Sequence, residues 1–301
     1  MTTRRYLVYD VFTAHAMEGN PLAMVLDGDG LDTEKMQKTA REFNLSESVF
    51  ILPPENPLHR ARVRIFTPSY EMPFAGHPTV GAAVALAELD AGAAGMFVLE
   101  ENIGPVRCAV TKDGGAGFAE FDVPQLSERL PLNVDAAALA AALGLGPHEV
   151  GFENHCPGLW SAGVPYVTVP VAGLEAAAKV RFDNQAWLEL APRKENGALA
   201  SAYVYCRESV NHDSAFHARM FVPGSPSYED PATGSAAAAF SGAILAFDRP
   251  VDGEQRYWIE QGIEMGRPSR IRLDVDVRDG VAAGARIGGH AVKVAEGLLH
   301  V

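Results

Sequence analysis

The sequence predicts an α/β protein of the α+β type with two pseudo-symmetric domains, each a curved, mostly antiparallel sheet around one buried central helix. Three observations lead to this prediction: the length of 301 residues, a motif that occurs twice about half a chain apart, and a long apolar helix after each copy. One hydrophobic core rarely grows beyond about 250 residues, so two domains are expected. The 48% hydrophobic content can supply both cores.

The repeated motif indicates an internal duplication. One copy spans residues 64–77 and reads RIFTP, then EMPFAGH, whereas the other spans residues 219–235 and reads RMFVP, then EDPATGS. A weaker similarity pairs residues 19–25 with residues 163–169, which share a glycine and a proline in the same register. Two matches in the same order predict one copy of a duplicated unit in each domain.

Each copy reads as a strand, a loop and a helix. Residues 63–67 and 218–222 are rich in β-branched and aromatic side chains and run into Pro/Gly/Ser loops, which predicts strands. The helices that follow, at residues 78–89 and 235–247, are apolar on every face and must therefore be buried on every face. The surrounding strands are predicted at residues 6–12, 23–26, 49–52, 97–99, 166–171, 202–205, 257–259, 271–277 and 292–299.

One further helix and the join between the domains complete this organisation. Residues 33–43 carry apolar side chains at helical spacing after Asp32, which predicts a surface helix with Asp32 as its N-cap. The glycine-rich run at residues 113–117 is the strongest loop composition in the middle of the chain. We therefore expect a first domain at residues 1–115, completed by a C-terminal strand at residues 285–301, and a second domain at residues 116–284.

The charge balance and the cysteines exclude several classes of protein. The chain has 38 acidic against 25 basic residues and no cluster of Lys and Arg, so no nucleic-acid partner is expected. No signal peptide or membrane-spanning run is recognisable, which favours a cytoplasmic enzyme with no membrane partner. Cys108, Cys156 and Cys206 are far apart and predict neither a disulfide framework nor a zinc site.

Motifs for cofactors are also missing from the sequence. The chain contains no GxGxxG, no GxxxxGK followed by Ser or Thr, and no GxSxG, which argues against dinucleotide, nucleotide and α/β-hydrolase sites. No lysine lies in a motif at a helix start, so a Schiff-base cofactor is not suggested. The expectation is an enzyme that uses neither a metal nor a cofactor.

The starts of the two apolar helices are the candidate binding site. Their first N–H groups have no intrahelical partner and carry a partial positive charge. Gly76 and Gly234 in the preceding turns allow a ligand to approach the backbone closely, and Pro78 suits the first helical position. If the two domains face each other, both helix starts converge on one cleft that would attract a carboxylate.

Polar side chains near these helix starts are the candidates for chemistry. His77 alone would more often be a core or capping residue, and Asp230 alone would more often be an N-terminal cap. The equivalent positions of His77 and Ser235 in the two repeats favour a functional role. Glu47 stands at a strand entrance, where a lone glutamate is usually solvent-exposed, so spacing alone gives it little support.

Taken together, these motifs resemble those of the PhzF-like family, the phenazine-biosynthesis isomerases and their relatives. The resemblance follows the family's order from residue 10 to about residue 237. It implies the diaminopimelate epimerase-like fold, with the active site between two similar domains, and a homodimer. The matching segments are DVFT at residues 10–13, GNP at 19–21, NLSESVF at 44–50, FTP at 66–68, PFAGHPT at 73–79 and EDPATGSA at 229–236.

The resemblance also implies a role for each candidate residue. Glu47 matches the family's catalytic glutamate, which moves a proton between two substrate carbons. Such a carboxylate must have a pKa raised toward neutrality by burial, while helix N–H groups stabilise the developing charge without a cofactor. The resemblance places His77 and Asp230 beside Glu47 as catalytic residues, and Ser46, Gly76, Gly234 and Ser235 as residues that bind the substrate.

The sequence leaves three functions open. The first is a cofactor-independent isomerase acting on a small carboxylic acid, such as a trans-2,3-dihydro-3-hydroxyanthranilate-like amino or hydroxy acid. The second is an amino-acid epimerase or racemase of the same fold, although its two-cysteine form is disfavoured because no cysteine lies near a helix start. The third is a binding protein for small acids that has lost the chemistry. Ser48, where family members often carry Thr, is a small departure beside the proposed base.

Overall fold

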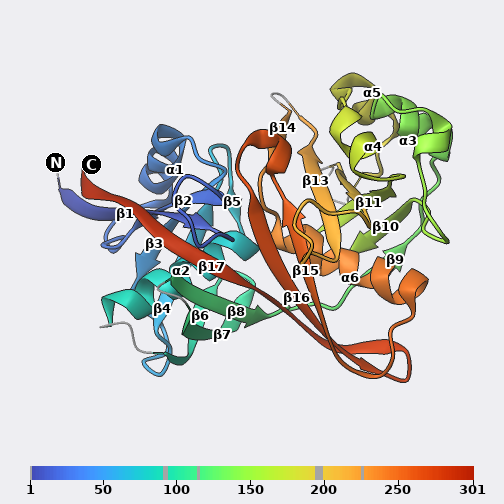
Figure 1. Cartoon of the computed structure of the whole chain (residues 1–301). Helices are drawn as coiled ribbons and strands as arrows, with labels where there is room; N and C mark the ends of the chain where they lie inside the picture. Colours follow the sequence, from blue (N-terminus) through green and yellow to red (C-terminus); the bar gives the residue numbers. More distant parts are fainter. Residues whose placement is uncertain (1, 91–93, 114–115, 194–198, 225–226) are drawn as a thin grey trace. The chain divides into compact units, whose positions relative to one another are not determined.

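The chain divides into two compact units. The structure is a computed structural model of the whole chain, and it describes residues 2–90, 94–113, 116–193, 199–224 and 227–301 (Figure 1). Unit 1 contains Met1–Asp122 and Gly288–Val301, and unit 2 contains Val123–Ile287. Unit 1 therefore includes the strand Ala116–Asp122, which the sequence-based division placed in the second domain. Gly114 and Gly115, on which that division rested, lie outside the described residues.

Unit 1 is a mostly antiparallel sheet that closes on itself. Its strands pair in the order β17, β1, β2, β3, β4, β6, β7 and β8, and β8 pairs again with β17. The pairs β2–β3 and β4–β6 are parallel. The bounds are β1 Thr3–Val11, β2 Asn20–Val25, β3 Glu47–Leu52, β4 Ala61–Phe66, β6 Gly95–Glu101, β7 Gly104–Asp113, β8 Ala116–Asp122 and β17 Val281–His300, with the short β5 Glu71–Met72 beside β4 (Figure 1).

Helix α2 (Gly76–Leu89) is the buried centre of unit 1. All of its residues from 76 to 87 are buried, as its apolar composition on every face predicts. A Cβ atom at Gly81 would lie 2.6 Å from Leu22 Cδ2 and 2.8 Å from Val11 Cγ2, so the glycine lets these side chains pack closely against the helix. The helix begins two residues earlier than expected, and Pro78 is its third residue rather than its first. The proline is still tolerated because no N–H in the first turn has an intrahelical partner.

Unit 2 repeats this arrangement with a second buried helix, α6 (Gly234–Asp248), in which residues 236–244 are all buried. Its strands pair in the order β9, β10, β11, β12, β13, β15 and β16, with β14 beside β13. The bounds are β9 Glu128–Leu130, β10 Gly158–Ser161, β11 Pro165–Pro170, β12 Ser201–Cys206, β13 Phe216–Val222, β14 Tyr228–Asp230, β15 Gly253–Gln261 and β16 Ser269–Arg278.

The duplication predicted from the sequence is confirmed by the strand pairing. The pairs β2–β3 and β11–β12 are parallel, as are β4–β6 and β13–β15. The pairs on either side are antiparallel in both units. Gly19 and Gly163, the glycines shared by the weaker sequence match, both have a positive φ. The two halves therefore share one topology down to individual backbone conformations.

Smaller helices lie outside these two centres. In unit 1, α1 (Thr33–Phe43) begins after Asp32, whose Oδ1 accepts a hydrogen bond from Lys35 N at 2.8 Å, as predicted. In unit 2, the fully buried Trp187 belongs to a separate hydrophobic cluster that three short helices help to form. No helix in the described part of the chain combines the length and apolarity needed to cross a membrane. The short helices are α3 Ala136–Ala142, α4 Leu174–Lys179 and α5 Asn184–Leu190, and the 3₁₀ turns are Pro147–Glu149 and Ile263–Met265.

Candidate active site

The pairing of strands directs Glu47 toward the start of helix α2. Glu47 is the first residue of β3 and is paired with Leu22 on β2. Leu22 packs against Gly81 of α2, so this row of side chains faces the helix. The Glu47 carboxylate Oε2 lies 3.5 Å from Nδ1 of His77, the second residue of α2, and the two side chains are 13% and 5% exposed. The glutamate is thus largely buried, unlike a typical glutamate at a strand entrance.

Burial determines the charge of His77. Desolvation lowers its pKa to about 3, because the charged form would lose its hydration. The imidazole is therefore neutral at physiological pH, and its contact with Glu47 joins a carboxyl group to a neutral ring. Its buried Nε2 has no hydrogen-bond partner among the described residues. A neutral imidazole can donate a proton from one nitrogen and accept one at the other, which suits proton transfer.

Tyr70 is a neighbour of Glu47 that the sequence analysis missed. Partial desolvation raises the pKa of Tyr70, and the negative charge of Glu47 is the second cause, so this 60% exposed tyrosine lies within electrostatic range of the carboxylate. Thr67 N donates to Tyr70 O at 2.9 Å and holds this loop against the end of β4. The signal was present in the repeat, since a Tyr-Glu pair occurs at residues 70–71 and again at residues 228–229.

In unit 2, Asp230 orders the turn that leads into α6. Its Oδ2 accepts a hydrogen bond from Thr233 Oγ1 at 2.5 Å, and its backbone oxygen accepts one from Gln261 Nε2 at 2.8 Å. The Thr233 hydroxyl, which stands at the N-cap position, is therefore committed to Asp230 rather than to the helix backbone. Gly234 and Ser235 follow as the first two residues of α6. Ser235 Oγ lies 2.7 Å from the hydroxyl of Tyr166.

The two buried helices both start without a side-chain cap. Neither Ala75 before α2 nor Thr233 before α6 makes a side-chain capping hydrogen bond. Their first-turn N–H groups are thus left uncapped by these side chains, at the electropositive ends of two buried helices. Such an end is suited to a carboxylate group of a ligand.

The predicted site residues fall into two groups. In unit 1, Ser46 directly precedes Glu47 and is half-buried, while Gly76 directly precedes His77 and is buried. In unit 2, Asp230, Gly234 and Ser235 lie at the start of α6. The sequence analysis therefore identified residues at both helix starts, but it missed Tyr70 and Tyr166, which come from neighbouring strands and loops.

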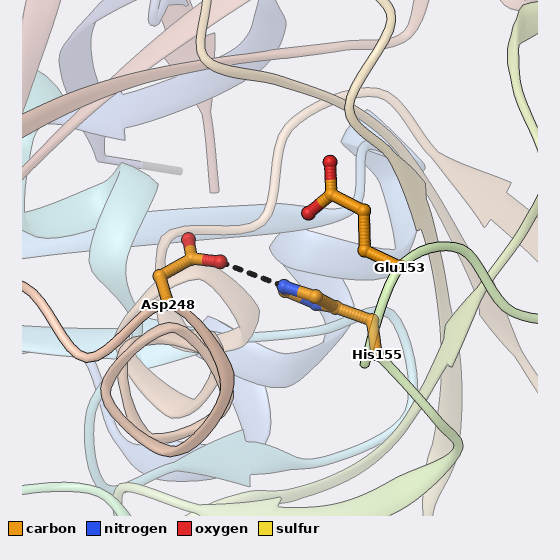
Figure 2. A group of neighbouring side chains, drawn as sticks. All are labelled: Glu153, His155 and Asp248. Carbon is orange, nitrogen blue, oxygen red and sulfur yellow. Dashed lines mark hydrogen bonds and ion pairs between the residues drawn. The ribbon is translucent and has the colours of Figure 1, made fainter.

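A second cluster in unit 2 has the residue types of a metal site. The ligand atoms of Glu153, His155 and Asp248 lie within 4.8 Å of one another (Figure 2). His155 Nε2 and Asp248 Oδ1 are 2.8 Å apart, and Arg207 Nη2 lies 2.6 Å from Asp248 Oδ1 and 3.4 Å from Glu153 Oε2. The Arg207 guanidinium therefore supplies the positive charge for both carboxylates. The cluster is best explained as an ion-pair network at the C-terminal end of α6.

The chain folds into two similar units. Each unit has a closed or curved sheet around a buried helix, with polar side chains at the helix start. This arrangement defines a class of isomerases and epimerases. A sequence model of one family in this class, described as phenazine biosynthesis-like protein, matches residues 9–297. The chain belongs to this family, which confirms the resemblance found in its motifs, and it is an isomerase.

Individual relatives and structures agree with this assignment. The chain is 69% identical to an uncharacterized isomerase of Mesorhizobium japonicum over 100% of both chains. It is 34% identical to the trans-2,3-dihydro-3-hydroxyanthranilate isomerase of Pseudomonas aeruginosa over 99% of both. A crystal structure of a PhzF family protein from Bacillus anthracis matches with a TM-score of 0.90 and 28% identity over 100% of both chains. A hydroxyproline epimerase from Agrobacterium vitis shares the fold alone, with a TM-score of 0.64, 12% identity, and coverage of 99% and 92%.

Proposed function

We propose that this isomerase transfers a proton between two carbon atoms of a small carboxylic acid, with Glu47 as the general acid and base. One observation carries the proposal: the largely buried Glu47 carboxylate lies 3.5 Å from the neutral imidazole of His77 at the start of α2. A carbon acid needs a positioned base and a means of stabilising the charge that develops when the proton leaves. Glu47 is the base, and the helix start is the electropositive group.

The proton balance needs no external reagent. Glu47 removes a proton from one substrate carbon, the electron pair of that C–H bond moves into the adjacent π system, and the same carboxylic acid returns the proton to a second carbon. His77, neutral throughout, hydrogen-bonds the carboxyl group or the reacting region and changes no net charge. Ser46, Gly76, Gly234 and Ser235 bind the substrate, and Asp230 assists proton movement in this proposal.

The relatives suggest a substrate to test first. The name of the Pseudomonas aeruginosa relative identifies trans-2,3-dihydro-3-hydroxyanthranilate as that enzyme's substrate. We propose this compound or another small amino or hydroxy acid for the present chain. A carboxylate is the group that the uncapped starts of α2 and α6 favour.

The test replaces the base without changing its shape. We expect Glu47→Gln to reduce isomerisation of trans-2,3-dihydro-3-hydroxyanthranilate, and deuterium uptake from D₂O, by roughly 10³-fold, because an amide cannot accept the proton. Mass spectrometry of the product and circular dichroism of the variant are the measurements. Glu42→Gln, on the exposed face of α1, is the control and should retain full activity. Deuterium uptake by Glu47→Gln at the wild-type rate would refute the role of Glu47.

The same experiment separates isomerisation from epimerisation. Migration of the proton to a second carbon supports the isomerase, whereas inversion at one carbon of an amino acid supports an epimerase. An epimerase with two thiols is not supported, because Cys108 and Cys206 are buried in strands, burial raises the pKa of both thiols, and Cys156 is an exposed residue outside both helix starts. We therefore propose a single carboxylate as the proton carrier.

A further inference from the structure

The pairing of strands shows which residues near the start of α6 in unit 2 are equivalent to those near the start of α2 in unit 1. In unit 1, Leu22 on β2 is paired with Glu47 on β3, and this row faces His77 of α2. In unit 2, the equivalent register pairs Tyr166 on β11 with Ser201 on β12. The repeat motif aligns His77 with Ser235, the second residue of α6. Tyr166 in unit 2 thus takes the position of Leu22 in unit 1, and Ser201 takes the position of Glu47.

Tyr166 makes the contact with the helix in this second row. Its hydroxyl lies 2.7 Å from Ser235 Oγ, whereas the residue across the strand pair, Ser201, takes the position of Glu47. Tyr166 is only 4% exposed. Every residue from 230 to 244 is buried except Ser235, which is partly exposed. Ser235 is therefore the residue of this segment that keeps some exposure to solvent, whereas Tyr166 is buried.

The chemistry of the two hydroxyls sets the direction of their hydrogen bond. A phenol, with a pKa of about 10, is a far stronger acid than an aliphatic alcohol and is the better donor. When Tyr166 donates to Ser235 Oγ, the proton of Ser235 is left to donate to a third group. At the electropositive start of α6, the group that best accepts it is an anionic oxygen.

We propose that Tyr166 is a positioning residue that holds the Ser235 hydroxyl as a donor to the substrate carboxylate. This inference rests on the proposed function above and deepens it, because it assigns a positioning partner to Ser235, one of the residues proposed to bind the substrate. Because a carboxylate is present in both the ground state and the transition state, the contact lowers KM and contributes little to kcat.

The experiment compares two buried tyrosines on neighbouring strands, of which one has a hydroxyl bonded to Ser235 and the other does not. Tyr166→Phe should raise KM for trans-2,3-dihydro-3-hydroxyanthranilate by roughly five- to tenfold with kcat within about twofold, as expected for one lost hydrogen bond. Tyr203→Phe is the matched control, since Tyr203 lies on the adjacent β12, is fully buried, and has a hydroxyl with no hydrogen-bond partner among the described residues. This control should leave KM unchanged.

A double variant tests whether Tyr166 acts through Ser235. Ser235→Ala should raise KM at least as much as Tyr166→Phe, and the variant with both changes should be no worse than Ser235→Ala alone. Additive effects in the double variant, or an equal rise in KM for Tyr203→Phe, would overturn the proposal.

A crystallographic comparison decides the matter without a substrate. The wild-type protein should show Ser235 in one rotamer directed at Tyr166, and Tyr166→Phe should show Ser235 in several rotamers. An unchanged single rotamer in Tyr166→Phe would refute the positioning role. If the wild type fails to turn over the test substrate while the rotamer changes as expected, the proposed substrate is wrong and the role of Tyr166 stands.

Discussion

The two units of this protein keep the same supporting ion pair but differ in chemistry. In unit 1, the Arg64 guanidinium binds both oxygens of Glu71 at 2.6 and 2.7 Å, and in unit 2 Arg219 binds both oxygens of Glu229 at 2.8 and 2.9 Å. Each arginine also lies over a phenylalanine ring on its own strand. In each unit the ion pair joins the short strand that leads into the buried helix to the longer strand beside it.

The residues at the helix starts have diverged instead. Glu47 in unit 1 corresponds to Ser201 in unit 2, and His77 corresponds to Ser235. Further along, Glu101 at the end of β6 corresponds to Gln261 at the end of β15, since the parallel pairs Arg62–Glu100 and His217–Glu260 fix the register. At these three positions unit 1 carries ionisable groups and unit 2 carries neutral ones, whereas the ionisable Asp230 of unit 2 corresponds to Met72 of unit 1.

The largest expected effect on stability comes from the ion pair of unit 2. Arg219 is 6% exposed, and its Nη1 also donates to Ala177 O at 2.7 Å. Arg219→Met leaves Glu229 in a partly desolvated place without its partner and should lower the free energy of unfolding by about 3–5 kcal/mol. Arg64→Met, which affects a somewhat more exposed pair with no bond to a backbone carbonyl like that of Arg219 to Ala177, should cost less, about 1–3 kcal/mol. Urea denaturation measures both, and equal losses would contradict the comparison.

The next effect in size concerns Glu101, the buried carboxyl group beneath the start of α2. Thr79 Oγ1 lies 2.7 Å from both Ala75 O and Glu101 Oε1. A hydroxyl has one proton, so when Thr79 donates to Ala75 the glutamic acid must be protonated and donate to Thr79. Burial raises the pKa of Glu101 to about 8, in agreement with this arrangement.

Glu101→Gln gives unit 1 the glutamine that unit 2 carries at the equivalent position, Gln261. Between pH 4.5, the ordinary pKa, and about pH 8, Glu101 keeps a proton in the native state that it has lost in the unfolded state. The stabilisation that comes from this difference is therefore complete below pH 4.5 and is lost as the pH rises to about 8. The wild type should therefore lose about 1.4 kcal/mol per pH unit relative to the variant across the window. Thermal or urea unfolding at several pH values measures the difference, and parallel pH profiles would show that Glu101 is ionised in the native state.

A smaller pH effect is expected from His217 in unit 2. Burial opposes its charge, but hydrogen bonds with Glu260 and Glu264, each at 2.9 Å, outweigh this and raise the pKa to about 9. The stabilisation is complete below the ordinary pKa of 6.5 and is lost as the pH rises through 9. His217→Gln should be less stable than the wild type at pH 6, and the gap should narrow toward pH 10. His59→Gln, at the corresponding but more exposed contact with Glu100, should cost less at pH 6. An undiminished gap at pH 10 would refute the charged histidine.

Patterns along the chain predicted the elements that depend on local composition. The two buried helices were recognisable because their side chains are apolar on every face, and α1 because Asp32 caps an amphipathic run. The long strand β17 was expected at residues 292–299 from its composition and at residues 285–301 in the division into domains, whereas it begins at Val281, so its first residues were missed. Its beginning follows Asp279 and Gly280, both with positive φ, as a tight hairpin turn requires. That Asp-Gly pair was the available signal for the missed part.

The sequence by itself determined the family, the duplication and the residues at the two helix starts, because each of these is a matter of residue order. Only the tertiary structure decided the burial of Glu47, the neutral state of His77, the protonation of Glu101 and the bond between Tyr166 and Ser235. These depend on which strand lies beside which and on how much water reaches each group. Desolvation and register are properties of the folded sheet, so they emerge only when residues distant along the chain come into contact.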